Sequence, residues 1–198
     1  MGFFHPQPVG LPGLVAFIIG FLLFIASFLR TRRGSGGGAP ASRRSGLSTV
    51  GVVVQMIAFS LAGLGRIEVG LPAMSPAAIV QAFAVAALML LCVLTFDFAA
   101  RAMGANWSVV ARMREGHELV TSGIFARLRH PIYTGLAAFM IGMAIAFGHP
   151  ANLIVAVPLY AIGTWIRVRE EERLLRAQFG PAYDAYAARV KRFLPGII

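Results

Sequence analysis

Long apolar runs separated by short polar segments dominate the pattern of this chain. A helix needs roughly 17–25 mostly apolar residues to cross the hydrocarbon core of a bilayer. Five runs approach or reach this length, the last two being the shortest: 9–29, 47–65, 77–100, 132–147 and 151–166. The pattern therefore predicts an all-α, polytopic membrane protein with about five transmembrane helices.

The first run resembles a signal peptide only superficially. It holds no charge, and its basic residues Arg30, Arg32 and Arg33 follow it. A secretory signal places its basic residues before an apolar core of about 7–15 residues. We therefore expect the first run to be a retained membrane helix.

The segments between the runs suggest a division of the chain. Residues 30–46 are rich in Arg, Gly and Ser and lack apolar periodicity, which predicts a flexible basic loop. Residues 148–150 separate the last two runs, which predicts a helical hairpin over 132–166. We expect a three-span scaffold at 1–100 and a second region at 101–198, which ends in amphipathic helices that lie at the membrane interface.

Composition agrees with a membrane protein. Hydrophobic residues make up 58% of the chain and charged residues 13%. A soluble domain has about 45–50% and 25%, respectively. A disordered chain would leave this apolar surface in water. A soluble domain of 198 residues could not bury it in a single core.

The net charge of +10 at first suggests a nucleic-acid partner. All 18 basic residues except Arg66, however, lie in three segments: 30–46, 101–131 and from 167 onward. Five spans can place all three on the cytoplasmic side, as the positive-inside rule requires. We therefore expect anionic membrane lipids as partners and no nucleic acid. The N-terminus would lie outside a bacterial-type cytoplasmic membrane and the C-terminus in the cytoplasm.

One polar cluster surrounds the start of the fourth run. Pro131 suits the first turn of a helix, which places His130 at its cap and Tyr133 in its first turn. Together with Arg129, the free N–H groups of this helix end favour a carboxylate or phosphate. The alternative is an interfacial belt, in which Arg and His extend toward water and Tyr lies among the headgroups.

A second polar cluster follows the fifth run. On a helix, Arg167 shares a face with Glu171, and Glu172 shares one with Arg176. These residues could form solvated ion pairs, or one glutamate could point inward and accept the hydroxyls of a ribose. Because successive residues differ by about 100°, at most two of Glu170, Glu171 and Glu172 can be ligands.

Several other sites are not expected. The four histidines lack the close spacing of a zinc site, so no metal is predicted. Residues 34–39 fit a dinucleotide-binding pattern only loosely and follow a membrane run, whereas that motif follows a strand. Cys92, the only cysteine, lies in an apolar run and is expected to be buried.

Four motifs occur together in the second half of the chain: 117–125 (HELVTSGIF), 129–135 (RHPIYTG), 170–172 (EEE) and 179–186 (FGPAYDAY), with Pro195 beyond them. In order and spacing they resemble the membrane methyltransferases related to isoprenylcysteine carboxyl methyltransferase and the phospholipid N-methyltransferases. The resemblance covers roughly residues 104–197. The first three runs match only as generic membrane helices.

The resemblance implies S-adenosylmethionine as the methyl donor, bound in a cytoplasmic C-terminal region. Arg167 would be the catalytic residue that faces the substrate and orients its nucleophile, and Glu171 would take the ribose or adenosine. The other implied cofactor-binding residues are His117, Leu119, Val120, Phe125, His130, Pro131 and Tyr133. Phe125 stands where the family often has Tyr, which implies a weaker polar contact there.

The expected function is therefore methyl transfer from S-adenosylmethionine to a lipophilic small molecule or a lipid. Carboxylate O-methylation is preferred, followed by N-methylation of a lipid amine; a thiol acceptor stays open. The alternatives are a non-catalytic membrane scaffold or permease-like protein and a nicotinamide-dependent membrane reductase of related fold. The sequence favours no particular oligomeric state.

Overall fold

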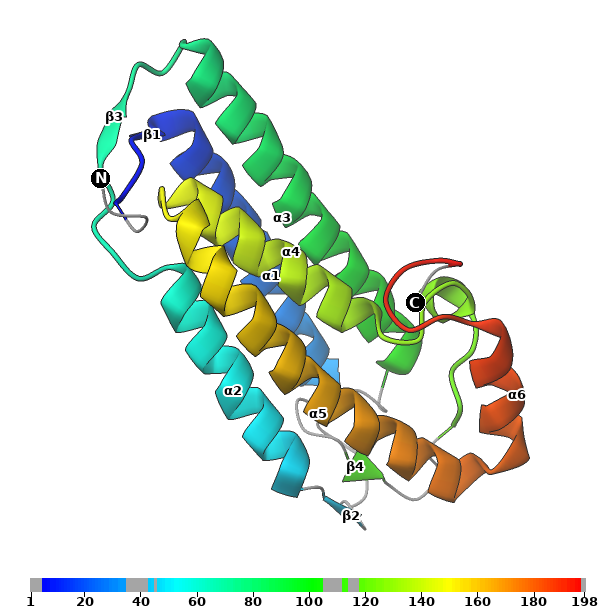
Figure 1. Cartoon of the computed structure of the whole chain (residues 1–198). Helices are drawn as coiled ribbons and strands as arrows, with labels where there is room; N and C mark the ends of the chain where they lie inside the picture. The colour runs from blue at the N-terminus through cyan, green and yellow to red at the C-terminus, as the bar shows by residue number, and fades with distance from the viewer. Residues whose placement is uncertain (1–4, 35–42, 45, 105–111, 114–117, 197–198) are drawn as a thin grey trace.

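The computed structural model describes residues 5–34, 43–44, 46–104, 112–113 and 118–196 (Figure 1). Short helical turns occur at η2 (Gly123–Ala126) and η3 (Pro150–Asn152). The helices are α1 (Leu11–Gly34), α2 (Gly46–Ala62), α3 (Pro76–Met103), α4 (Pro131–Ala146), α5 (Leu153–Phe179) and α6 (Pro181–Arg189). The strands are β1 (Val9–Gly10), β2 (Arg43–Arg44), β3 (Val69–Leu71) and β4 (Arg112–Met113). β1 pairs in parallel with β3, and β2 pairs antiparallel with β4.

Each of the five apolar runs forms a helix, so the helical class is confirmed. Within the described part of the chain, three helices are long and apolar enough to cross a membrane: Leu11–Thr31, Pro76–Met103 and Pro150–Phe179. The helices Gly46–Ala62 and Pro131–Ala146 are shorter. Large apolar side chains such as Leu22 and Phe83 remain exposed on the bundle, as expected for an integral membrane protein whose surface contacts lipid.

Two element boundaries differ from the sequence prediction. α1 continues to Gly34, so the first residues of the predicted loop 30–46 are helical, and residues 35–42 and 45 lie outside the described residues. α5 continues past the predicted end of the fifth run to Phe179, because the i,i+4 ion pairs of its charged part suit a helix. Gly180 then adopts a φ of 48°, a left-handed conformation that favours glycine, and Pro181 begins α6.

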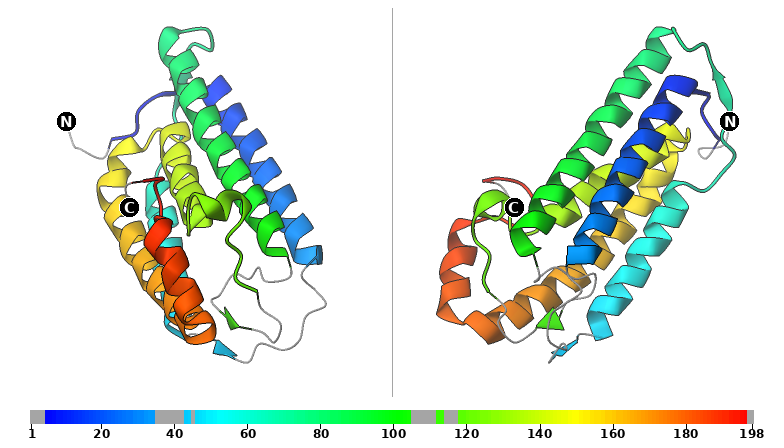
Figure 2. Two further views of the ribbon diagram at one scale, coloured as in Figure 1. Left: turned by 90° about the vertical axis from the view of Figure 1, so that its right-hand side faces the viewer. Right: turned by 180° about the vertical axis from the view of Figure 1, so that it is seen from behind.

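The helices pack in two groups (Figures 1 and 2). α3 packs against both α1 and α4, and α2 packs against α5. Phe17, Met89 and Phe139 belong to the apolar core of the first group, which also contains Cys92, buried as predicted. A second core lies where α2 and α5 meet α4, and it includes Ala58, Met140 and Tyr160. Packing therefore crosses the proposed boundary at residue 100, which stays a prediction.

The two ends of the bundle differ in character. At one end, the N–H of Gln7 donates to the carbonyl of Gly148 and that of Val9 donates to Glu68, both at 2.8 Å. These bonds tie the N-terminal segment to two of the connections between helices. At the other end lie the first turn of α4, the charged part of α5, α6 and the C-terminal tail (Figure 1). This second end contains most of the buried charge.

Candidate functional site

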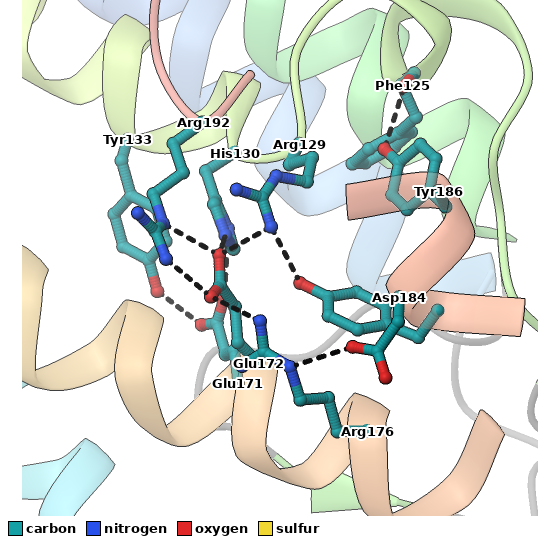
Figure 3. Close-up of polar contacts among 11 residues, drawn as sticks. Phe125, Arg129, His130, Tyr133, Glu171, Glu172, Arg176, Asp184, Tyr186 and Arg192 are labelled. Carbon is teal, nitrogen blue, oxygen red and sulfur yellow. Dashed lines mark hydrogen bonds and ion pairs between the residues drawn. The ribbon is translucent and has the colours of Figure 1, made fainter. Parts of the chain in front are cut away.

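The polar clusters predicted from the sequence meet where α4 begins and the charged part of α5 passes it (Figure 3). His130 is the N-cap residue of α4, and Pro131 occupies the first helical position, where its missing N–H costs no hydrogen bond. At this cap position the side chain of His130 points into the protein, and the residue is 5% exposed. The predicted helix start is confirmed. The carboxylates that face it come from α5 of the same chain.

Glu171 lies on the more open side of this cluster. It accepts a short hydrogen bond from the hydroxyl of Tyr133, and its Oε2 lies 3.6 Å from Nδ1 of His130. Its Oε1 lies 3.9 Å from the guanidinium of Arg167, one turn earlier on α5. The side chain is 26% exposed, compared with 3% for Glu172. Glu171 is therefore held in place while part of its carboxylate stays accessible.

Glu172 is enclosed by basic groups. The guanidinium of Arg192 donates two hydrogen bonds of 2.9 Å to its two oxygens. Arg129 lies 3.0 Å from Oε1, Nε2 of His130 lies 3.2 Å from the same oxygen, and Arg176 lies 3.5 Å from Oε2. Such planar, charge-assisted contacts are strong and directional. Glu172 therefore joins α5 to the segment before α4 and to the C-terminal tail.

Arg167, on α5, connects the cluster to α2. Its guanidinium donates to Oε1 of Gln55 at 2.8 Å and stacks over the ring of Tyr133, with 4.9 Å between its central carbon and the ring centroid. It is 9% exposed. The hydroxyl of Tyr160 donates to the carbonyl of Tyr133 at 2.7 Å, which fixes the first turn of α4 against α5.

The C-terminal tail closes the other side of the cluster. Its carbonyls at Lys191 and Arg192 accept backbone hydrogen bonds of 2.9 Å from Arg129 and His130. α6 adds two buried tyrosines. Tyr183 accepts a hydrogen bond from Arg129 at 3.3 Å, and Tyr186 donates to the carbonyl of Phe125 at 2.7 Å. These tyrosines therefore pack inward, which the interpretation of this segment as an interfacial helix did not anticipate.

Burial and charge set the protonation of two groups outside the membrane helices. Burial lowers the pKa of His130, but the hydrogen bonds and negative charges of Glu171 and Glu172 outweigh it, so the pKa is raised above its usual 6.5. The imidazole is therefore stabilised as a cation between two carboxylates. Burial raises the pKa of Tyr186 to about 12, so its phenol remains a hydrogen-bond donor.

The structure brings together four of the predicted site residues and leaves others apart. His130, Tyr133, Arg167 and Glu171 contact one another, and Pro131 is buried beside them. Phe125 is buried in η2 against Tyr186, away from Glu171 in Figure 3. Leu119 and Val120 are half-buried before η2. His117 lies outside the described residues.

Sequence reasoning missed the roles of Glu172, Arg192 and Gln55. The i,i+4 pair of Glu172 and Arg176 was recognised, but as a solvated ion pair. Arg192 looked like an interfacial residue, because nothing in the sequence shows that the tail folds back over α4. Gln55 lies 112 positions before Arg167 within an apolar run, and only its polarity inside that run marked it.

The chemistry of the cluster fits S-adenosylmethionine. A partly open carboxylate such as Glu171 can accept hydrogen bonds from ribose hydroxyls. Nε of Arg129 is buried and has no hydrogen-bond partner among the described residues, so it could donate to a ligand carboxylate. Within the same described residues, no group of three or more His, Cys, Asp or Glu side chains is arranged to hold a metal.

Relatives with known names match a little less than half of the chain. Protein-S-isoprenylcysteine O-methyltransferase B of Arabidopsis thaliana is 33% identical over 88 residues, which are 42% of this chain and 43% of that protein. The mouse (Mus musculus) protein-S-isoprenylcysteine O-methyltransferase is 36% identical over 100 residues, or 48% of this chain and 34% of that protein. The chain therefore spans less than half the length of these relatives.

A solved structure and a family model also match. The eukaryotic intramembrane Ras methyltransferase, isoprenylcysteine carboxyl methyltransferase, aligns over 78% of this chain and 54% of its own, with a TM-score of 0.46 and 23% identity. The family model described as phospholipid methyltransferase matches residues 75–182. This match covers more than half of the chain and includes α3, α4, α5 and both glutamates of the cluster. The chain therefore belongs to the phospholipid methyltransferase family.

Proposed function

We propose that this protein transfers a methyl group from S-adenosylmethionine to a lipophilic, membrane-borne acceptor that carries a carboxylate. One observation carries the proposal: Glu171 is held by Tyr133 and His130 with its carboxylate partly exposed, and the buried guanidinium of Arg167 lies beside it. Family membership supports the reaction type. The names of the relatives, which are O-methyltransferases of isoprenylcysteine proteins, support a carboxylate as the acceptor.

Each residue of the cluster has a separate task in this proposal. Glu171 would accept the ribose hydroxyls of the methyl donor, while His130 and Tyr133 orient its carboxylate. Arg129 would donate to the carboxylate at the amino-acid end of the donor. Residues that precede or begin α4 would contact its remaining parts. The residues in this last group are His117, Leu119, Val120, Phe125 and Pro131.

The chemistry itself asks little of the protein beyond positioning. S-adenosylmethionine, when bound, supplies a methyl group on a positively charged sulfur. Ester formation joins an acceptor oxygen to this carbon as the carbon–sulfur bond breaks, and an ionised carboxylate has no proton to lose. Arg167 would hold that carboxylate in line for attack. The C-terminal tail and α6 would keep water from the cluster.

Titration calorimetry with S-adenosylhomocysteine and the detergent-purified protein tests the cofactor site. We expect the wild type to bind and Glu171→Ala to bind at least about tenfold more weakly, because a charged hydrogen-bond acceptor is lost. Asp184→Asn is the control, since Asp184 is exposed and its ion-pair partner is Arg176. A wild type that does not bind would refute the proposal.

A comparison of acceptors tests the reaction. N-acetyl-S-farnesylcysteine offers a prenylated carboxylate, and phosphatidylethanolamine in mixed micelles offers a lipid amine. With a labelled methyl donor, we expect label in a base-labile ester of the first compound. Label found only in the lipid amine would show N-methylation instead and would contradict the assignment of a carboxylate acceptor.

We propose further that all five apolar helices cross a bacterial-type cytoplasmic membrane, with the N-terminus outside and the polar cluster on the cytoplasmic side. The positions of the basic residues support this orientation. Cys92 is the only cysteine, so Cys92→Ser gives a background for single-site labelling. In intact cells, a membrane-impermeant maleimide should label Met74→Cys and spare Arg189→Cys. The opposite pattern would invert the topology.

A further inference from the structure

A glutamine of the N-terminal half contacts the predicted catalytic arginine. Gln55 lies on α2, outside the range 75–182 that the family model matches, and it is 3% exposed. Its Oε1 accepts a hydrogen bond of 2.8 Å from Arg167, and its Nε2 donates one of 2.7 Å to Oγ1 of Thr164. The side-chain amide therefore bridges two residues of α5 that are almost one helical turn apart.

The backbones of α2 and α5 come unusually close at this point. A Cβ atom added to Gly163 would lie 2.9 Å from the carbonyl oxygen of Gly51 and 3.0 Å from the backbone nitrogen of Gln55. A Cβ added to Gly51 would clash with the side chain of Arg167. Two glycines thus let the helices approach until Gln55 reaches the guanidinium. This close crossing gives Gln55 little freedom to adopt another position.

We propose that Gln55 is a positioning residue that sets the orientation of the Arg167 guanidinium toward a carboxylate acceptor, and that it must be uncharged to do so. This inference rests on the proposed function and deepens it. It gives α2 a direct part in acceptor recognition, although the helix contributes no residue to the range matched by the family model.

The neutrality of the amide is the specific part of the proposal. The oxygen of Gln55 fixes one edge of the guanidinium without supplying a counter-charge. A glutamate of the same size would place a full negative charge 2.8 Å from Arg167 and form a charge-assisted pair. That charge would repel an incoming carboxylate and compete with it for the same cation. Specificity for a carboxylate would therefore fall even though the local geometry is preserved.

The test compares Gln55→Glu with Gln81→Glu. Gln81 is a good control because it too makes two hydrogen bonds inside the bundle, accepting from Gly10 at 2.8 Å and donating to Ile145 at 3.0 Å. It lies at the end of the bundle opposite Arg167. Both variants introduce the same charge between helices and carry a similar risk of misfolding. S-adenosylhomocysteine binding shows that each purified variant retains its cofactor site.

We expect Gln55→Glu to raise the KM for N-acetyl-S-farnesylcysteine at least about tenfold, the effect of one charged hydrogen bond, with S-adenosylhomocysteine affinity unchanged. Gln55→Met, which is uncharged and similar in size, should lower kcat because it no longer orients Arg167, and should raise KM less. Gln81→Glu should leave both constants near those of the wild type.

The failures are distinguishable. Absence of S-adenosylhomocysteine binding by the wild type would refute the proposed function. A wild type that binds it but does not methylate the prenylated carboxylate would overturn the inference and leave the cofactor site standing. Equal effects of Gln55→Glu and Gln81→Glu on KM would also overturn the inference, because they would reduce Gln55 to a structural residue.

Discussion

Glu171 and Glu172 are adjacent in the chain but have different environments. Glu172 is surrounded by three arginines and His130, whereas Glu171 contacts Tyr133 and His130 and remains partly open. Their spacing of about 100° on α5 directs the two carboxylates to different neighbours. The same spacing turns Glu170 toward Arg173, at 2.8 Å. At the residue scale, then, one of these carboxylates is suited to a ligand and its neighbour to holding the fold.

Glu172→Gln should destabilise the protein strongly. The substitution leaves the buried guanidinium of Arg129 without its ionic partner, a change that costs about 3 kcal/mol. For a chain of this size we expect Tm to fall by roughly 6–12 °C. Thermal unfolding of the purified protein in one detergent measures the shift. Asp184→Asn, which breaks the exposed pair with Arg176, should change Tm by about 4 °C or less, and equal shifts would contradict this role of Glu172.

His130 predicts a pH dependence of stability. Because its pKa is raised above 6.5 in the folded state, its contribution to stability is fully present below about pH 6.5 and is lost as pH rises through the folded pKa. The groups responsible are Glu171 and Glu172 on α5. We therefore expect the difference in Tm between the wild type and His130→Gln to shrink as pH increases. A difference that stays constant with pH would show that His130 is not charged in the folded protein.

At the element scale, the crossing of α2 and α5 depends on Gly51 and Gly163, whereas Gly142, where α4 contacts α3, has more room. A Cβ added to Gly163 meets backbone atoms of α2 at 2.9 and 3.0 Å. A Cβ added to Gly142 on α4 meets side-chain atoms at 3.4 Å or more, which is ordinary contact. Helix length and apolar character were predictable here, but the closeness of each crossing depends on which residues happen to face each other.

Gly163→Ala should push α2 away from α5 and cost about 1–3 kcal/mol, as overpacking does. It should also weaken the contact between Gln55 and Arg167, so methyl transfer should fall with it. Gly142→Ala is the matched control, and we expect it to be neutral or stabilising because alanine favours a helix by about 1 kcal/mol. Thermal unfolding and activity assays measure both. A stable, active Gly163→Ala would show that the two helices can move apart freely.

At the scale of the whole molecule, the two halves of the chain do not form separate bodies. α2, from the first half, packs against α5, from the second, and α3 packs against α4 in the same way (Figure 1). The range 75–182 that the family model matches therefore does not include α2, whose Gln55 contacts Arg167. A break in the chain between α2 and α3 would place Gln55 and Arg167 on separate fragments.

Two co-expressed fragments, 1–72 and 73–198, should assemble and bind S-adenosylhomocysteine, because the cut lies in an exposed connection far from the polar cluster. Fragment 73–198 alone should bind at least about tenfold more weakly, since it lacks the buried contacts of α2. Affinity purification through a tag on one fragment, followed by calorimetry, tests both expectations. Equal binding by the second fragment alone would show that the first half is dispensable for the cofactor site.

Much of the architecture was predictable because it depends on local physics. Apolar runs long enough to cross lipid must form helices there, since every backbone N–H and C=O must be satisfied within the segment. Pro131 marks the start of α4 because it lacks an N–H, and the i,i+4 spacing of Arg167 and Glu171 places both on one face of α5. The order of the motifs in the second half identified the family before any contact was known.

Tertiary structure alone decided which partner each of these groups meets. Helical spacing gives the direction of Glu172 but does not show that Arg192 returns along the tail to bind it. Nor does the apolar run around Gln55 show that two glycines bring it to Arg167, because that contact joins residues 112 positions apart. Local propensity acts over a few residues, whereas a buried polar contact depends on how separate helices pack. The sequence by itself therefore determined the helices and the family, and packing determined the site.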